Sequence, residues 1–337
     1  MQKKLLYAAH TVHRKLPVNY EEMHDGKISF IRTEESIDAS YLLEIKNAYI
    51  SPFGVIFKNG FVVKESVYSM FKPNSFTLSF FKKIALNKVR KISGNCIVAH
   101  HSYYQNYYHF LLEILPRLFV LKEQATSLKL VINKNIPSFV KEYIELFNFK
   151  EIVYINDDEI AKVDNIIVST YLSRGLAYNE SVIKEMSAWL CQKLYDDTIT
   201  NAPEKIFISR DNATYRKTVN ENDVFSFLQQ KGFVKFNLEE PSIKAQANFF
   251  KNAKYIIGSH GAGFSNMIYS KNCLLAMDII HEQHPQDCFY NLANCFNIDY
   301  LYFQCRGTGA NSYANNDDIL VNLDTFEQTY HQYIFDK

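Results

Sequence analysis

The chain has 337 residues, of which 47% are hydrophobic and 22% are charged, and its formal net charge at pH 7 is +1. This length suggests about two domains, the composition is that of a soluble globular protein, and the small net charge gives no reason to expect a nucleic-acid partner. The chain contains no apolar run of the roughly 18 residues that a transmembrane helix needs, and the apolar run after its basic start is too short for a signal peptide.

Six cysteines are scattered along the chain and form no C-x-x-C pair. A zinc ribbon or a thioredoxin-like redox site is therefore not expected. Free thiols suit a reducing compartment, and together with the missing signal peptide they predict a cytoplasmic protein.

Residues 41–67 are expected to form a small antiparallel β-meander near the N-terminus. Short apolar runs occupy 48–50, 55–57 and 61–63. Asn59-Gly60 separates the last two runs, and this dipeptide is a strong signal of a tight hairpin turn.

The stretch 66–112 contains no Asp or Glu, but it combines several lysines and phenylalanines. An ordinary helix with a solvated basic face and its phenylalanines in the core is the favoured interpretation. A basic, aromatic stretch can also contact an anionic membrane surface. This alternative predicts peripheral contact with the inner face of the cell membrane through residues 71–94.

The segment that begins at Asn106 has the apolar period of a helix. His109 and Glu113 lie four residues apart and share one face of that helix, and Pro116 is expected to kink or end it just before Arg117. A histidine and a carboxylate one turn apart can act as a general base and its orienting partner. Alternatively, Glu113 pairs with Arg117 and His109 is hydrogen-bonded within the core.

Strands and helices alternate along the rest of the chain, which predicts an α/β protein with parallel sheets covered by helices. A polar, proline-bearing segment at 196–203 is the expected linker between two such units. The predicted strands are 128–132, 152–155, 163–169, 205–209, 233–237, 255–257, 274–280 and 300–304, and the predicted helices are 137–147, 179–194, 221–231, 242–252 and 324–335.

A glycine-rich loop follows the strand at 255–257 and precedes a helix expected to begin near Phe264. Glycines let the backbone approach a ligand closely, and the first turn of a helix attracts anions. This order of elements predicts a phosphate or other anion site, and a tight turn without a ligand is the alternative. The residues assigned to this site are Gly258, His260, Gly261, Ala262, Gly263 and Asn266.

The same loop is similar to two other motifs. Gly261-Ala-Gly263 partly fits the dinucleotide fingerprint with Asp278 as the ribose-binding acid, although the third glycine is missing and the spacing is short. An NAD(P)-dependent oxidoreductase is therefore an alternative function. A lipase oxyanion loop is also similar, but G-x-S-x-G does not occur in the chain, so a hydrolase would lack its nucleophile.

A cationic loop follows the strand at 205–209. Ligands bind outside the carboxyl ends of parallel strands, and arginine can hold a phosphate through two parallel hydrogen bonds. The alternative is a solvated basic turn with Asn220 as a helix N-cap. The candidate binding residues are Ser209, Arg210, Arg216, Lys217 and Asn220.

A bound metal is not expected from the sequence. His281-Glu-Gln-His284 is one residue short of the H-E-x-x-H helix motif, and no D-x-D triplet occurs in the chain.

Three blocks, in this order, resemble the motifs of glycosyltransferase family 61. They are Asn106–Leu118, the region Ser209-Arg210…Arg216…Asn220-Glu221, and Gly258–Asn266, and Gly232-Phe233, Gln246 and Ala253 also fit the pattern. The resemblance covers roughly residues 95–280. It implies two facing Rossmann-like halves, the fold type called GT-B, and an inverting, metal-independent transferase that uses a nucleotide-activated sugar.

With this fold, residues 1–198 are expected to form an acceptor-side domain, with the meander at 41–67 and an α/β unit at 95–195. Residues 199–320 are expected to form the nucleotide-sugar domain, and 321–337 a C-terminal helix. The absence of a signal anchor favours the bacterial family members, which assemble capsule, lipopolysaccharide or related surface polysaccharides.

The resemblance also implies roles for the candidate residues. His109 and Glu113 form the expected catalytic pair, with the choice of base left open, and the loops at 209–220 and 258–266 hold the nucleotide sugar while Asp278 accepts from the ribose hydroxyls. The expected donor is UDP-linked, the expected acceptor is an oligosaccharide or a lipid-linked glycan, and no cofactor or metal is required. A non-catalytic glycan-binding protein on the same fold is the remaining alternative.

Overall fold

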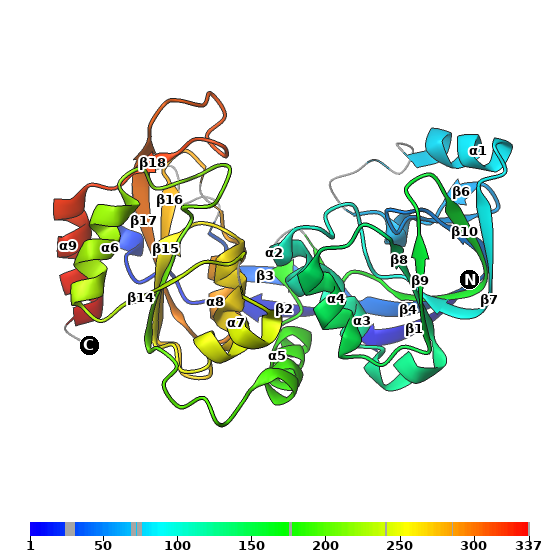
Figure 1. The fold of residues 1–337 in the computed structure, drawn as a ribbon, viewed down its shortest axis with the longest axis horizontal. Coiled ribbons are helices and arrows are strands. Elements are labelled where there is room, and N and C mark those ends of the chain that lie inside the picture. The colour runs from blue at the N-terminus through cyan, green and yellow to red at the C-terminus, as the bar shows by residue number, and fades with distance from the viewer. Residues whose placement is uncertain are drawn as a thin grey trace. The chain divides into compact units, whose positions relative to one another are not determined.

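The computed structural model describes residues 1–23, 31–68, 72, 76–174, 177–239, 241–284 and 286–335. The chain divides into two compact units, whose elements Figure 1 labels. The first consists of Met1–Thr11 and Ser36–Met186, and the second of Val12–Glu35 and Ser187–Lys337. Because a compact set of contacts is not the same as an independently folding domain, the predicted domain boundaries stay predictions.

The first unit is built on an eight-stranded mixed sheet with the order β6-β5-β4-β10-β7-β8-β9, in which β1 also pairs with β4. β10 is antiparallel to β4 but parallel to β7, and β8 and β9 continue the parallel part. The strands are β1 (Gln2–Tyr7), β4 (Ser40–Ile50), β5 (Ile56–Lys58), β6 (Phe61–Val62), β7 (Val89–Ile97), β8 (Lys129–Asn133), β9 (Glu151–Ile155) and β10 (Ile160–Ser169).

The predicted hairpin turn at Asn59-Gly60 is confirmed, since the φ angles of the two residues are +53° and +82° and a two-residue type I′ turn requires both to be positive. β4, β5 and β6 are antiparallel, as the predicted meander requires. They do not form a separate small sheet, however. β4 extends back to Ser40 and pairs with β10, so the meander is one edge of the eight-stranded sheet.

The basic stretch after β6 contains one helix and one strand. Helix α1 (Thr77–Ala85) buries Phe80, whose ring stacks on Phe57 at 4.1 Å, as the helical interpretation of this stretch predicts. Strand β7 follows, and the sequence pattern does not reveal it because charged residues and a glycine interrupt its apolar period. Part of the stretch that was assigned to membrane contact, residues 71 and 73–75, lies outside the described residues.

The helix that begins after Asn106 continues past Pro116. Of the two predicted outcomes, a kink or an end before Arg117, the end is therefore wrong. It consists of α2 (Tyr107–His109), a π-helical turn (Phe110–Ile114) and α3 (Leu115–Phe119). Pro116 has no N–H to offer the carbonyl of Leu112, and the hydroxyl of Ser173 donates to that carbonyl instead. The hydrogen bond that proline cannot make is therefore replaced from outside the helix.

The second unit is built on a six-stranded sheet with the order β14-β13-β15-β16-β17-β18. The first five strands are parallel, and β18 is antiparallel to β17. Figure 1 shows helices on both faces, with α6 and α9 on one side and α7 and α8 on the other. The strands are β13 (Lys205–Ile208), β14 (Val234–Phe236), β15 (Tyr255–Ser259), β16 (Leu275–His281), β17 (Asp299–Gly307) and β18 (Ile319–Leu320), and these helices are α6 (Glu221–Gln230), α7 (Ile243–Phe250), α8 (Cys288–Cys295) and α9 (Leu323–Tyr330).

The order of the parallel strands reverses between β13 and β15, because the chain places β14 on one side of β13 and all later strands on the other. In doubly wound sheets, ligands bind at such a switch point, outside the carboxyl ends of the strands. The cationic loop follows β13 and the glycine loop follows β15, so both predicted binding loops lie at this switch point.

These sheets and helices confirm the predicted α/β class, whereas the facing GT-B arrangement stays a prediction. The remaining α-helices are α4 (Ser138–Glu145) and α5 (Glu180–Leu194), and the short strands are β2 (His10–His13), β3 (Glu34–Ile37), β11 (Ser173–Arg174) and β12 (Ala177–Tyr178). In the part of the chain that the structure describes, every helix is too short or too polar to cross a lipid bilayer.

Candidate functional site

The glycine loop after β15 packs tightly against β13 and the loop that follows it. A Cβ atom added to Gly258 would lie 2.6 Å from the carbonyl oxygen of Ile208, and one added to Gly261 would lie 2.0 Å from Nη1 of Arg210. The φ angle of Gly261 is 170°, an extended value that any residue adopts. These glycines are therefore required by close approach to neighbouring atoms and not by an unusual backbone conformation.

The helix after this loop begins at Ala262 and is a 3-10 helix that extends to Tyr269, with all residues from Gly263 onward buried. The amide of Asn266 donates to the side chain of Gln246 at 3.0 Å, and Asn266 has no exposed surface. The binding role predicted for Asn266 stays a prediction, and the described contacts give it a structural one.

His260 directly follows β15, and it forms a buried pair with Asp278 in the middle of β16. Nδ1 of His260 lies 2.7 Å from Oδ2 of Asp278, and the hydroxyl of Tyr300 donates to the same oxygen at 2.7 Å. Asp278 is fully buried. It can orient His260, whereas the predicted contact with ribose hydroxyls would first require Asp278 to become exposed.

Arg210 and Arg216 are the principal cations of the loop after β13. The side chain of Arg210 donates to the carbonyls of Arg216 at 3.1 Å and Tyr215 at 2.8 Å. Burial and the neighbouring guanidinium of Arg216 lower the pKa of Arg210 to about 10, and burial also lowers the pKa of Arg216. Neither arginine forms an ion pair with a carboxylate among the described residues.

Two details of Arg216 indicate that this loop conformation is held at an energetic cost. Its φ angle is +58°, which is uncommon for a residue with a Cβ atom. Its Nε is buried and has no hydrogen-bond partner in the described structure. A phosphate oxygen could accept from this N–H group and neutralise part of the charge of both arginines.

The other predicted residues of this loop are engaged by the protein. Ser209 donates to Glu221 at 2.5 Å, and the amide of Asn220 pairs with both backbone groups of Val321. The side chain of Asn220 therefore makes no N-cap hydrogen bond to α6. The backbone N–H of Lys217 donates to Oδ1 of Asp318 at 2.8 Å, and its carbonyl accepts from the N–H of Ile319 at 2.8 Å.

A small cavity of about 10 Å³ adjoins these groups in the second unit. Sequence reasoning missed two of its residues as binding candidates, because His281 and His284 drew attention only as an incomplete metal motif. Nε2 of His281 lies 3.6 Å from Oδ2 of Asp317, and burial lowers the pKa of His284. The lining residues are Arg216, Ser259, His260, Ile279, Ile280, His281, His284 and Ile319.

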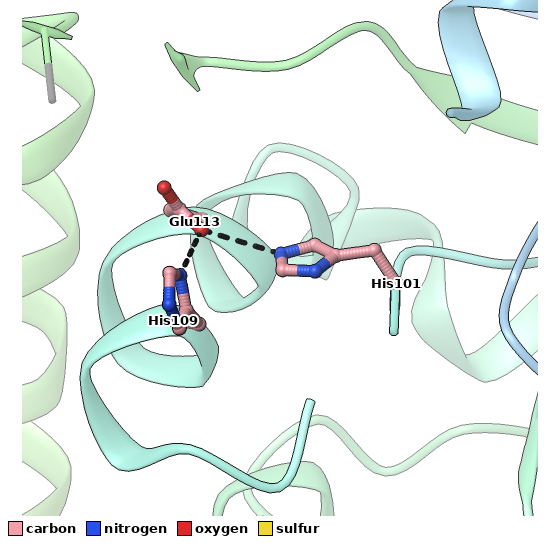
Figure 2. A group of neighbouring side chains, drawn as sticks. All are labelled: His101, His109 and Glu113. Carbon is pink, nitrogen blue, oxygen red and sulfur yellow. Dashed lines mark hydrogen bonds and ion pairs between the residues drawn. The ribbon is translucent and has the colours of Figure 1, made fainter. Parts of the chain in front are cut away.

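The first unit contains a compact group of titratable side chains around Glu113, which Figure 2 shows between two histidines. Glu113 is 1% exposed. Its Oε2 lies 2.6 Å from Nδ1 of His109 and 3.3 Å from Nε2 of His101, and the hydroxyl of Tyr68 donates to its Oε1 at 2.9 Å. His109 and Glu113 come from one helix, as predicted, whereas sequence reasoning missed His101 and Tyr68.

The electrostatics of this group favour an ionised carboxylate. Burial opposes the charge of Glu113, but the hydrogen bond with His109 and the close approach of His101 outweigh burial and hold the pKa of Glu113 below its usual value. Burial lowers the pKa of His101, although Glu113 partly offsets this effect. His101 is therefore a neutral ring beside an anion at neutral pH.

Arg117 does not pair with Glu113, so the alternative in which these two side chains form an ion pair is wrong. Its buried guanidinium donates to the carbonyls of Ala99 at 2.6 Å and Ser169 at 2.9 Å, and it lies 4.4 Å above the ring centre of Tyr171. The π-helical turn contributes to this separation, because its extra residue per turn rotates Arg117 away from the face that carries Glu113.

The group around Glu113 also meets a distance test for a metal site, since one ligand atom each from His101, His109 and Glu113 lies within 4.8 Å of the others. The tautomer of His101 does not fit this role. Its Nδ1 accepts from the backbone N–H of Tyr103 at 3.3 Å, which leaves the proton on Nε2 in the neutral ring. The nitrogen that faces Glu113 is therefore a donor and not a free metal ligand.

Comparison with protein-family models gives a match over residues 107–276 to the family described as Glycosyltransferase 61. The chain belongs to glycosyltransferase family 61. No curated protein matches it.

The matched segment includes candidate residues from each of the two units of this glycosyltransferase. It begins two residues before His109 and includes Glu113, and it contains the cationic loop and the glycine loop of the second unit. His101, Tyr68 and Asp278 lie outside it. These three residues are bonded to Glu113 or His260, so the structure extends the candidate site beyond the family match.

Proposed function

We propose that this glycosyltransferase acts with inversion of configuration and that His109 is its general base. The observation that carries the proposal is the environment of Glu113. This carboxylate is buried and both of its oxygens are engaged, so it cannot itself reach a substrate hydroxyl. His109 is one-fifth exposed, and its Nδ1 is fixed by Glu113 at 2.6 Å, which leaves Nε2 to meet a substrate.

In the proposed reaction, an acceptor hydroxyl attacks the anomeric carbon of the donor from the face opposite the leaving group. The new bond joins the acceptor oxygen to that carbon while the bond from the carbon to the nucleotide phosphate breaks. Nε2 of His109 takes the hydroxyl proton, and the carboxylate of Glu113 stabilises the imidazolium that forms. The nucleotide leaves with both electrons of the broken bond.

We assign to Arg210 and Arg216 the stabilisation of the negative charge that develops on the leaving nucleotide. Two arginines that form no ion pair with a carboxylate of the described residues can stabilise a diphosphate through charge-assisted hydrogen bonds. The cationic loop and the glycine loop lie at the switch point of the parallel sheet, where nucleotides bind in folds of this class. Cations can replace the metal that other transferases use, which supports a metal-independent reaction.

The resemblance of the three motif blocks supports a biological role in the cytoplasmic assembly of bacterial capsule, lipopolysaccharide or a related surface polysaccharide. The proposed donor is UDP-linked, and the proposed acceptor is an oligosaccharide or a lipid-linked glycan. Membership of a glycosyltransferase family removes the reason to retain an NAD(P)-dependent oxidoreductase as the alternative. A catalytically inactive glycan-binding protein is the second candidate, and the absence of turnover would identify it.

The test is a transfer assay with a panel of nucleotide sugars and glycan acceptors, in which NMR reports the anomeric configuration of the product. We expect inversion, and we expect the rate to be unchanged in EDTA. Retention of configuration would overturn the assignment of a single base, and loss of activity that a divalent metal restores would overturn the metal-free reaction.

A matched pair of variants isolates the base in this assay. His109→Ala should abolish turnover while the affinity for the nucleotide stays unchanged, because the donor is assigned to the second unit. His10→Ala removes an exposed histidine of the first unit that has no assigned role, and it should leave both quantities unchanged. Normal turnover of His109→Ala would rule out His109 as the base.

A further inference from the structure

The β5–β6 hairpin and helix α1 leave several large apolar side chains in solvent. Phe61 is 78% exposed, Leu78 82%, Phe81 51% and Leu86 60%. Single exposed apolar residues are normal, but a group of them on adjacent elements marks a surface that binds another surface. We refer to these four side chains as the α1 patch.

The hairpin and the helix that carry the α1 patch are in direct contact. A Cβ atom added to Gly60, at the hairpin turn, would lie 3.6 Å from Cζ of Phe81. Figure 1 also shows α1 beside β6 in the first unit. Residues that follow the turn and residues of the helix therefore contribute to one continuous surface.

Helix α1 also has a buried side, so its exposed apolar residues are additional to those that pack in the core. Phe80 is buried and stacks on Phe57, and Ile84 packs against the same cluster. The core-facing side of α1 is thus already filled, while Leu78 and Phe81 extend from other positions of the same helix. A helix that is apolar on both sides has a second surface to bury.

The charges around the α1 patch are predominantly positive. No Asp or Glu occurs between residues 66 and 112, and Lys72 and Lys82 are exposed. Two nearby carboxylates have partners of their own. Asp158 pairs with Lys88 at 3.1 Å, and the carboxylate of Asp157 accepts from Asn133 at 2.7 Å and Asn135 at 3.0 Å.

We infer that the α1 patch docks on an anionic lipid bilayer. Exposed leucine and phenylalanine side chains enter the boundary between headgroups and acyl chains, and lysines around them are attracted to anionic headgroups. A second protein would bury the apolar side chains equally well, but the excess of lysine matches a negatively charged surface. The inference extends the proposed function, because a chain held at the bilayer can meet a lipid-linked acceptor there.

The test is co-sedimentation of the full chain with vesicles of phosphatidylcholine that contain about 30% phosphatidylglycerol. We expect the chain to bind these vesicles, to bind pure phosphatidylcholine more weakly, and to be partly released by salt. The double variant Leu78→Ser/Phe81→Ser should lower the partition coefficient at least about tenfold, because burying one such side chain is worth about that factor. Lys82→Glu should lower it about 30-fold, because reversing one charge removes about 1 kcal/mol of attraction and adds a similar repulsion.

The matched control is Leu274→Ser, which removes an apolar side chain that is 53% exposed in the second unit. It should leave vesicle binding unchanged. Far-UV circular dichroism of the double variant should match that of the parent chain, since both substituted side chains lie largely in solvent.

Three outcomes would overturn the inference. The parent chain does not bind anionic vesicles, or the double variant binds them equally well. In the third, the parent chain forms a dimer but does not bind vesicles, and the double variant abolishes the dimer. Sugar transfer to a water-soluble acceptor separates this inference from the proposed function. If only the membrane inference fails, transfer persists without vesicle binding. If only the proposed function fails, vesicle binding persists without transfer.

Discussion

The candidate base in the first unit and the candidate anion site in the second unit differ in how the protein neutralises their charges. Glu113 is nearly fully buried, and His109, His101 and Tyr68 surround its carboxylate. Arg210 and Arg216 are only partly buried, and within the described residues no carboxylate pairs with either.

The difference shows which charged group finds its hydrogen-bond partners within the protein and which one needs a ligand to supply them. A charge with its hydrogen bonds satisfied is held in one geometry before the substrate arrives, as an orienting group for a base requires. Two neighbouring cations without a counterion are destabilised until an anion binds. The first arrangement therefore suits catalysis, and the second suits recognition of a phosphorylated donor.

After the loss of turnover expected for His109→Ala, the largest effect is expected from removing the charge of Glu113 without changing its shape. Glu113→Gln should lower turnover about 1,000-fold, because a neutral amide no longer stabilises the imidazolium of His109. Donor affinity, measured by calorimetry, should stay unchanged. Glu145→Gln alters an exposed carboxylate of the same unit and serves as the control. A parallel loss of donor affinity in Glu113→Gln would contradict the division of roles between the units.

The next effect tests recognition in the second unit. Arg216→Ala should weaken donor binding about 10- to 100-fold, since hydrogen bonds to a charged group contribute about 1.5–3 kcal/mol. Arg216→Lys should recover part of this loss, because it restores the charge but not the planar fork. Arg306→Ala, at an exposed arginine of the same unit, is the control. Unchanged donor affinity in Arg216→Ala would remove the cationic loop from the proposed donor site.

The pairing of His109 with Glu113 could be predicted because both residues lie on one helix, where a spacing of four residues fixes their proximity. The α/β class and most strands of the second unit followed from alternating apolar runs. Tyr68 and His101 could not be predicted, because separate segments of the chain bring them to Glu113. Their spacing along the sequence does not indicate that contact.

The function of the glycines was only partly predictable for the same reason. Parallel pairing of β13 with β15 places Gly258 beside Ile208, and this register depends on the whole sheet. The sequence suggested that the glycines leave room for a ligand. The structure shows that Gly258 and Gly261 leave room for Ile208 and Arg210, so the loop and the cations are positioned together.

A third prediction concerns the pH dependence of stability in the first unit. Burial lowers the pKa of His100 to about 4, whereas an unfolded chain has a histidine pKa of about 6.5. The unfolded state therefore binds a proton first as the pH falls. The resulting stability is fully present above about pH 6.5 and is lost as the pH falls toward 4.

At pH 5 this loss should amount to about 2 kcal/mol of the free energy of unfolding, because each unit of pH below 6.5 contributes about 1.4 kcal/mol. Urea unfolding of the parent chain at pH 7 and pH 5 measures it. His100→Gln should lower stability at pH 7 but flatten the dependence on pH, and the exposed His10→Gln should change neither. An equally steep dependence in His100→Gln would show that another group is responsible.

A fourth prediction separates two glycines of one loop. Gly261→Ala displaces the flexible end of the Arg210 side chain, since its Cβ would lie 2.0 Å from Nη1, and it should weaken donor binding about tenfold with little loss of stability. Gly258→Ala meets the backbone carbonyl of Ile208 at 2.6 Å, which cannot move as easily. It should lower the free energy of unfolding by about 1–3 kcal/mol. Urea unfolding and calorimetry on both variants make the comparison, and a reversed order of effects would contradict it.

The smallest effect is expected from Tyr68→Phe, which keeps the ring that stacks on His101 at 4.3 Å and removes only the hydroxyl that donates to Glu113. Loss of one hydrogen bond to a buried carboxylate should raise the pKa of Glu113 and lower turnover about threefold to tenfold. The KM for the donor should not change. Tyr154→Phe, at a more exposed tyrosine of the same unit, should leave both unchanged. If Tyr68→Phe alters stability alone, with turnover and its pH profile intact, then Tyr68 supports the fold and does not position the carboxylate that orients His109.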